Sequence, residues 1–409
     1  MTQQNFRAVS ESRWFVLGVA LCMFLLMGVY YGWSIFVGPL EREFGWARSQ
    51  TSLPLTICLV MFCFGAVAGG LLGKIWPHRF TVWLGALSIG VGFSLASRAA
   101  SLPELCIGYG VMGGAGIGAA YNAILSTVLG RFSDRLGLAS GLLMMCYGLG
   151  GLVINIVGSR VIEAWDWRVT MFGMAVAISG VMLLGGLFLK PPPAAQAEPY
   201  RAQARAKARR APAEEALDLS PRQMVLRRSF QMYFIWVLLL YASGLMLIGH
   251  AVPFAGEQGL GAGTAALLAG AVAACNGVGR LLSGLALDRF GRKMVMRGIS
   301  CCFIIASGLL FLAPQLHSAG LATAGYILVG LSYGATVACT VAVVNLFYGA
   351  RNYSINFSLA NFASAFAALL GPYLAGFLHK STGGYGAMTI AMFAFGCAAL
   401  LLAIQLKRP

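Results

Sequence analysis

The side chain in this sequence best suited to bind a charged ligand is an arginine in the middle of a long apolar run. Arg280 stands 16 residues after Thr264, where the run begins, which is about 24 Å along a helix. A guanidinium stays charged at physiological pH and matches the geometry of a carboxylate. Asn276 precedes it by four residues, so a helix would present both side chains on one face. The pair predicts an anion-binding site in which Asn276 either donates to the ligand or orients the guanidinium.

The apolar runs contain no deep acidic residue, because all 13 fall at termini, in hydrophilic stretches or at the ends of runs. The runs therefore offer Arg280 no buried carboxylate as a structural partner, and helix carbonyls are its remaining structural alternative. A coupled proton would travel on a histidine, on the ligand's own carboxylate, or not at all. His250 is the only histidine within an apolar run. It is the candidate for proton coupling, with a plain polar role near the membrane surface as the alternative.

The composition indicates a membrane protein. Hydrophobic residues make up 59% of the 409 residues and charged residues only 10%, whereas a soluble chain has about 25% charged residues. Such a chain cannot cover a globule with polar surface, which excludes a soluble enzyme, and the same numbers exclude disorder. The long continuous apolar runs are typical of helices rather than of a β-barrel.

Twelve apolar runs approach the length of about 20 residues that a transmembrane helix needs. We predict spans at 14–37, 51–72, 79–97, 103–128, 137–158, 169–189, 231–253, 264–287, 295–313, 319–346, 354–378 and 385–405. The expected fold class is therefore an all-α membrane protein with twelve transmembrane helices.

The basic residues predict the orientation and the domains. With the N-terminus inside, 22 of the 29 Lys and Arg residues fall in cytoplasmic segments and 6 in external loops, so we expect both termini to be cytoplasmic. The long hydrophilic stretch 190–230 separates six spans from six. We expect an N-terminal six-helix bundle over 1–189, a basic cytoplasmic linker over 190–230 that fixes topology or lies on anionic lipid, and a C-terminal six-helix bundle over 231–409.

Other kinds of chemistry are not indicated. The ten cysteines lie inside apolar runs without metal-binding spacing, and the spans supply no nucleophile with a matching base. We expect no metal, no cofactor and no enzymatic activity. The net charge of +16 comes from the segments between spans, so we expect no nucleic acid as a partner.

Six plus six helices around a central cytoplasmic linker resemble the major facilitator superfamily. The segment 284–293, which reads GLALDRFGRK, joins spans eight and nine and is similar to that superfamily's loop motif. The resemblance implies that Asp288 caps a neighbouring helix end and that Arg289 and Arg292 make a cytoplasmic gate contact. Gly291 would allow the tight turn.

Several patches resemble, more narrowly, the oxalate/formate antiporter family of that superfamily, which is related to the monocarboxylate transporters. The most specific are RFSDRLGLASG at 131–141 and NGVGR at 276–280. Further patches lie at 28–34, 114–122, 147–150 and 350–353. The resemblance covers nearly the whole chain apart from the linker.

Carried over residue by residue, this resemblance implies a ligand cavity. The family's carboxylate-binding arginine falls on Arg280. The aromatic residues of the cavity wall fall on Tyr31, Tyr121, Tyr147 and Tyr333. A lysine that is the second basic residue of the oxalate carrier falls on Asn361, and the acidic residue that the animal monocarboxylate transporters have four positions before the arginine falls on Asn276. Packing aromatics are the alternative reading of the tyrosines.

The asparagine at position 361, where the oxalate carrier has a lysine, bears on the charge of the expected ligand. A dicarboxylate brings two negative charges into a low-dielectric cavity and needs about two counter-charges, whereas this cavity supplies one. A monocarboxylate such as lactate, pyruvate, acetate or formate fits that balance, and Asn361 could hydrogen-bond its hydroxyl or keto oxygen.

We therefore expect a secondary active transporter of small monocarboxylates that binds the anion at Arg280, near the membrane midplane between two pseudo-symmetric bundles, and works by alternating access. Proton-coupled symport is expected because the monocarboxylate branch works that way. The expected partners are a small carboxylate, a proton and membrane lipids, and the expected unit is a monomer in the cell membrane. The alternatives are an oxalate/formate-type anion antiporter and a transporter-like membrane sensor.

Overall fold

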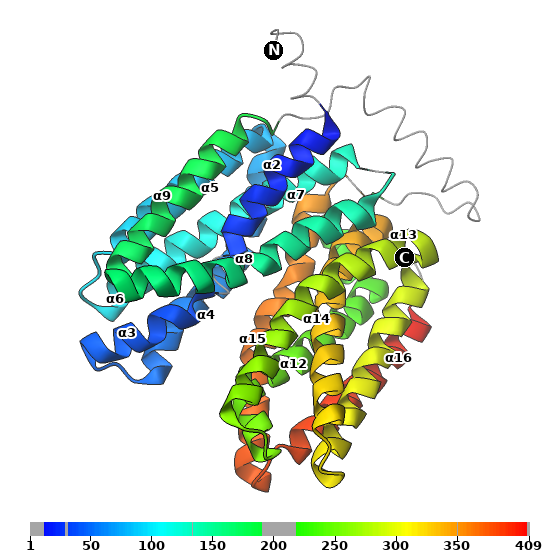
Figure 1. The fold of residues 1–409 in the computed structure, drawn as a ribbon. Helices are drawn as coiled ribbons and strands as arrows, with labels where there is room; N and C mark the ends of the chain where they lie inside the picture. The colour runs from blue at the N-terminus through cyan, green and yellow to red at the C-terminus, as the bar shows by residue number, and fades with distance from the viewer. Residues whose placement is uncertain (1–11, 29–31, 133, 190–217, 350, 407–409) are drawn as a thin grey trace. The chain divides into compact units, whose positions relative to one another are not determined.

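The computed structural model describes residues 12–28, 32–132, 134–189, 218–349 and 351–406. Within these ranges every regular element is a helix (Figure 1), which confirms the predicted all-α class. Ten of the described helices are long and apolar enough to cross a membrane. They cover eleven of the twelve predicted spans, because α13 (Ala262–Gln315) contains two of them. A helix satisfies its own backbone hydrogen bonds, as a segment surrounded by lipid must.

The chain divides into two compact units, which do not follow the two halves of the sequence strictly. The first consists of Met1–Ala139, Cys146–Glu215 and Tyr353–Leu359. The second consists of Ser140–Met145, Ala216–Asn352 and Ala360–Pro409. The domain boundaries predicted from the sequence stay a prediction.

The first unit is built from the N-terminal helices. They are α2 (Arg13–Met27), α3 (Ser34–Phe44), α4 (Arg48–Ile75), α5 (His78–Ala96), α6 (Leu102–Leu105), η2 (Cys106–Gly113), α7 (Gly114–Arg131), most of α8 (Leu136–Ala164) and α9 (Trp167–Gly186). The prediction of one continuous helix over 14–37 differs from the structure, where α2 ends at Met27 and α3 begins at Ser34. The η2 segment is a π-helix, which the apolar pattern could not indicate.

Glycines of α7 allow close packing against its neighbours. A Cβ added at Gly116 would lie 2.7 Å from the carbonyl oxygen of Gly85 in α5. One added at Gly114 or Gly118 would collide with carbonyl oxygens of α4, those of Cys58 and Phe62. Because small residues let helix backbones approach in a membrane, this face of α7 allows α4 and α5 to pack closely against it within the first unit.

The second unit is built from the C-terminal helices. They are α11 (Pro221–Leu226), α12 (Arg228–Glu257), α13, α14 (Ala319–Tyr348), most of α15 (Tyr353–Thr382) and α16 (Gly386–Gln405). The long α13 is two helices joined at Gly291, whose φ of 73° lies in the left-handed region that glycine tolerates. We call Ala262–Phe290 its first limb and Arg292–Gln315 its second limb.

The C-terminal end of the predicted linker is helical. Its residues 190–217 lie outside the described part of the chain, but α11 follows a capping box in which Ser220 and Gln223 bond to each other's backbone. The backbone N–H of Leu219 donates to the carbonyl oxygen of Tyr348 at 3.0 Å. Residues 218–226 are therefore attached to the end of α14.

The glycine packing of α7 makes a testable prediction. Gly118→Ala would place a methyl group against the Phe62 carbonyl, so we expect destabilisation of about 1–3 kcal/mol from overpacking. Gly130→Ala is the matched control, because nothing lies within 4 Å of an added Cβ there and alanine favours the helix by about 1 kcal/mol. Thermal unfolding in detergent should show a lower Tm for the first variant only. Equal Tm values for the two variants would contradict this packing.

Candidate anion-binding site

Arg280 lies in the first limb of α13 with none of its side chain exposed. Its Nε–H donates to Oδ1 of Asn276 at 3.0 Å, and its Nη1–H donates to the backbone carbonyl oxygen of Met144 at 2.8 Å. Met144 and Arg280 both belong to the second unit. Since Nε–H can only donate, the amide oxygen of Asn276 must face it. Asn276 therefore hydrogen-bonds to the guanidinium from the same helix face, and its role towards a ligand stays a prediction.

Glycines bring three backbones together around this arginine. Next to it, a Cβ added at Gly279 would collide with the Leu331 carbonyl oxygen of α14. In the other direction, a Cβ added at Gly334 of α14 would collide with the Asn276 carbonyl oxygen. A Cβ added at Gly141 of α8 would lie 3.0 Å from the Arg280 carbonyl oxygen. The close approach of α8 at Gly141 is what lets the Met144 carbonyl reach the guanidinium.

Burying the charge of Arg280 in this arrangement is energetically unfavourable. A charged side chain in the interior of a transmembrane helix costs several kcal/mol, and the two acceptors described above are neutral. A ligand can reach the buried guanidinium only if a present contact gives way. The Met144 carbonyl is bonded to the guanidinium end of the side chain, so it occupies a position that a carboxylate oxygen could take.

Two other predicted cavity residues lie in the same unit. Tyr333 of α14 is 7% exposed, and its ring centroid lies 5.6 Å from that of Tyr241. Gly244 of α12 makes room for the Tyr333 ring, because an added Cβ would collide with it. Asn361 is half-buried on α15. The contacts of Arg280 described above include neither residue, so the cavity role of both stays a prediction.

The first unit contains an aromatic cluster around two of the predicted tyrosines. The rings of Tyr121 and Tyr147 lie 5.2 Å apart, and Tyr121 also stacks on Phe24 at 5.0 Å and on Phe357 at 6.1 Å. Both tyrosines are buried. Tyr31 lies outside the described residues. These tyrosines belong to a different unit from Arg280, and their role in a cavity stays a prediction.

A polar cluster beside Tyr121 was not expected as a site. Nδ2 of the buried Asn122 lies 2.7 Å from three acceptors, the Ala66 carbonyl, the Ser354 carbonyl and the Ser358 hydroxyl, among which its two N–H bonds donate. The Ser126 and Ser354 hydroxyls are also 2.7 Å apart. The cluster ties α4 and α7 to the first turns of α15, within the first unit. Asn122 belongs to the patch 114–122, which resembles the oxalate/formate antiporter family. That resemblance was the sequence signal from which this cluster could have been found.

His250 lies at a break in α12, where its φ of −122° and ψ of 17° are not helical. Pro253 explains the break, because it has no N–H to donate to the preceding turn. His250 Nε2 is 3.1 Å from the Pro372 carbonyl oxygen and Nδ1 is 2.9 Å from the Tyr385 hydroxyl. A carbonyl only accepts, so Nε2–H donates to Pro372, and in the tautomer with its proton on Nε2 the Nδ1 atom accepts from the Tyr385 hydroxyl.

A contact between His379 and Glu257, close to His250, was not predicted. His379 Nε2 is 2.6 Å from Oε1 of Glu257, whose Oε2 accepts from the backbone N–H of Tyr385 at 3.2 Å. The rings of His379 and Tyr385 are 4.4 Å apart. Tyr385 therefore contacts both histidines, which joins the ends of α12, α15 and α16. Among the described residues, no group of three or more His, Cys, Asp or Glu is placed to hold a metal ion.

The predicted gate motif surrounds the turn of α13. Gly291 takes the left-handed conformation that a tight turn requires. Arg289 is exposed, and the guanidinium carbon of Arg292 lies 4.6 Å from the ring centroid of Phe347. Asp288 is half-buried. The helix-capping and gate roles of these side chains stay predictions.

Comparisons with known proteins agree with the resemblance noted from the sequence. The profile of the Major Facilitator Superfamily matches residues 19–372. The chain is 26% identical to the oxalate:formate antiporter of Oxalobacter formigenes over 89% of this chain and 85% of that one. It is 28% identical to monocarboxylate transporter 12-B of Danio rerio, over 90% of this chain and 81% of that one.

Solved structures share the fold. The proton:xylose symporter XylE matches 98% of this chain and 97% of its own with a TM-score of 0.70 and 14% identity. FucP in its outward conformation matches 96% of this chain and 99% of its own, with a TM-score of 0.68 and 16% identity. These likenesses confirm the expected fold class.

The contact between Asn276 and Arg280 makes a testable prediction about stability. Asn276→Leu keeps the size of the side chain but removes the acceptor that Nε–H now has, so we expect a loss of about 1–3 kcal/mol. Asn276→Asp is the matched variant, because it keeps an acceptor oxygen in the same place. Thermal unfolding in detergent should separate the two. If the leucine variant is as stable as the wild type, Asn276 does not hold the guanidinium.

Proposed function

Because the chain belongs to the Major Facilitator Superfamily, we propose that it is a secondary active transporter of small monocarboxylates that binds the carboxylate at Arg280. The family and the fold are those of multi-pass membrane transporters and not of enzymes. One observation carries the assignment of the ligand. It is a fully buried guanidinium, in a helix apolar enough to span a membrane, oriented by an amide four residues away.

The carboxylate takes the place of the Met144 carbonyl. A carboxylate oxygen is a charged acceptor, and charge-assisted hydrogen bonds are roughly twice as strong as neutral ones. The ligand therefore displaces the carbonyl from Nη1, while Asn276 keeps Nε in place. Transport then follows by alternating access. Tyr31, Tyr121, Tyr147, Tyr333 and Asn361 shape the cavity in this proposal.

A monocarboxylate is favoured over a dicarboxylate by charge. The predicted spans contain one deep permanent cation, Arg280, and Asn361 stands where the oxalate carrier's second basic residue falls. A second carboxylate would enter a low-dielectric site without a counter-charge. Monocarboxylate transporters of three animal species, at 25–28% identity over 90–92% of this chain, support the same assignment.

Oxalate-for-formate exchange is the second candidate function. It is favoured by the 26% identity to an oxalate:formate antiporter over 89% of this chain. Competition separates the candidates, because a monocarboxylate carrier should be inhibited by pyruvate and not by oxalate.

The proposed location is the cell membrane. In the proposed orientation both termini lie in the cytoplasm. The support is the excess of basic residues in the segments then facing inward, 22 against 6. A monomer is the proposed functional unit.

His250 is the proposed residue of proton coupling. The groups facing its ring are the Tyr385 hydroxyl and the Pro372 carbonyl. Behind them lie Glu257 and His379, and Tyr326 donates to the Ala251 carbonyl at 2.6 Å. A proton added at Nδ1 turns that atom into a donor, so the Tyr385 hydroxyl must rotate to accept. The change acts at the break in α12.

The carboxylate assignment is tested by uptake of labelled lactate into proteoliposomes. Arg280→Gln removes the cation, and losing one partner of a buried charge pair is worth about 3–5 kcal/mol, so uptake should fall at least about 100-fold. Arg280→Lys keeps the charge without the planar fork and should retain part of the uptake. Arg160→Gln, at an exposed arginine of α8, is the control and should match the wild type.

Excess unlabelled pyruvate should abolish the uptake in the same vesicles, and excess oxalate should not. Oxalate that competes as strongly as pyruvate would favour the exchange function. Uptake by Arg280→Gln at the wild-type rate would refute the proposed binding site.

The coupling assignment is tested by the dependence of uptake on external pH. Wild-type uptake should rise as the external pH falls, because a proton enters together with the anion in the proposed symport. His250→Gln cannot carry a proton at this position, so its uptake should not rise as the external pH falls. His317→Asn is the control, since His317 is exposed and asparagine tolerates its positive φ of 47°. An unchanged pH profile in His250→Gln would remove His250 from the coupling.

A further inference from the structure

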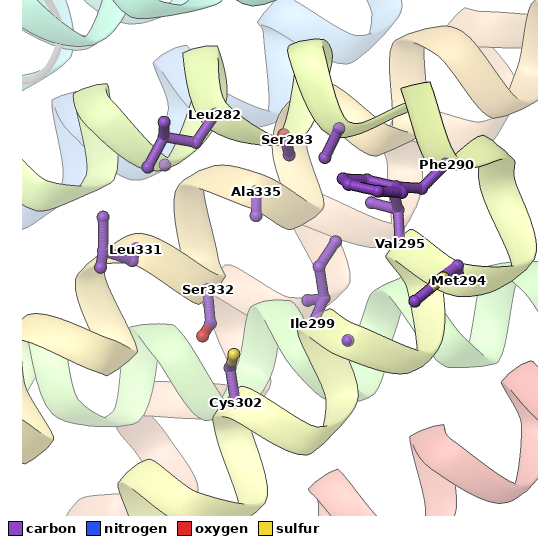
Figure 2. A pocket seen from close by; sticks show the side chains of 13 residues that line it. Leu282, Ser283, Phe290, Met294, Val295, Ile299, Cys302, Leu331, Ser332 and Ala335 are labelled. Atoms are coloured by element: carbon purple, nitrogen blue, oxygen red, sulfur yellow. The ribbon is translucent and has the colours of Figure 1, made fainter. Parts of the chain in front are cut away.

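A groove of about 340 Å³ runs along the surface of the second unit (Figure 2). Its walls are one stripe from each limb of α13, with residues four positions apart, and part of α14. The two stripes are Leu282, Ala286 and Phe290, and Met294, Gly298 and Cys302. Because residues four apart share one helix face, both limbs turn a continuous face to the groove.

The lining of the groove is suited to hydrocarbon. The rim is formed by exposed apolar side chains, with 53% of Leu282, 56% of Phe290 and 65% of Met294 accessible. The few polar groups are directed at protein atoms. The Ser283 hydroxyl donates to the Arg280 carbonyl oxygen at 3.2 Å, and Figure 2 shows the Ser332 hydroxyl pointing towards the Cys302 thiol.

The length of the groove fits one acyl chain. From Gly279 to Phe290 the first limb advances 11 residues, which is about 16 Å of helix. Half of a hydrocarbon core of about 30 Å is about 15 Å. The groove therefore spans one leaflet, as the chain of a single lipid does.

The charge at one end of the groove selects the headgroup. Arg289, Lys293 and Arg297 are exposed, and each is the sequence neighbour of a lining residue. The Arg289 guanidinium carbon lies 5.4 Å from the ring centroid of Phe290. Over 282–302 the sequence has four basic residues and one acidic residue, Asp288. Such a cluster attracts an anionic lipid surface.

We infer that this groove is a binding site for an anionic phospholipid, with one acyl chain along α13 and α14 and the phosphate at Lys293 and Arg297. The basic residues assign the site to the cytoplasmic leaflet, where anionic lipids gather. The site is separate from the carboxylate site, so its failure would leave the proposed transport function untouched.

Native mass spectrometry of the full chain tests this site with phosphatidylglycerol and phosphatidylcholine supplied together. One bound phosphatidylglycerol should exceed bound phosphatidylcholine about thirty-fold, because each of two basic side chains is worth about 1 kcal/mol towards a lipid with a net negative charge, which phosphatidylcholine lacks. Gly298→Leu should fill the groove and remove this bound lipid, because nothing lies within 4 Å of an added Cβ there. Gly308→Leu is the matched control in the same limb, equally open and outside the groove.

The double variant Lys293→Gln/Arg297→Gln is a second test, because it removes the charges and leaves the groove open. It should bind phosphatidylglycerol and phosphatidylcholine in equal amounts. Equal binding of both lipids to the wild type would overturn the inference, as would undiminished phosphatidylglycerol binding by Gly298→Leu and by the double variant. A dimer that dissociates in Gly298→Leu would assign the groove to a second copy of the chain and would also overturn it.

Discussion

The buried guanidinium of Arg280 is the constraint on which this molecule depends. A permanent charge in a membrane-spanning helix is unfavourable by several kcal/mol, and the structure contains it with hydrogen bonds to Asn276 and to the Met144 carbonyl. Both acceptors are neutral, so a charged acceptor would bind the same donors more strongly. These two hydrogen bonds are therefore weaker than those that a carboxylate would accept from the same donors.

Small residues make that arrangement possible. Gly279 and Gly334 let α13 and α14 approach beside the arginine, and Gly141 lets α8 approach its carbonyl. In lipid, helix association relies on close packing and on interhelical hydrogen bonds, and here the same glycines serve both. The tight face of α7 in the first unit follows the same principle, with carbonyl oxygens of α4 and α5 next to its glycines.

The sequence was sufficient for features that depend on local chemistry. Continuous apolar runs predicted the spans, and the predicted run 319–346 differs from α14 (Ala319–Tyr348) by two residues. The i, i+4 spacing predicted that Asn276 and Arg280 share a face, and they hydrogen-bond. The Met144 acceptor could not be predicted, because a backbone carbonyl leaves no signature in residue type. The pairing of Glu257 with His379, 122 positions apart, depends on tertiary packing that one sequence does not reveal.

The most direct test of the central claim is an experimental structure of the protein with a bound monocarboxylate such as pyruvate. We expect a carboxylate oxygen about 2.7–2.9 Å from a guanidinium nitrogen of Arg280, with the Met144 carbonyl displaced and the bond to Asn276 kept. Pyruvate bound elsewhere, with Nη1 of Arg280 still donating to the Met144 carbonyl, would contradict it.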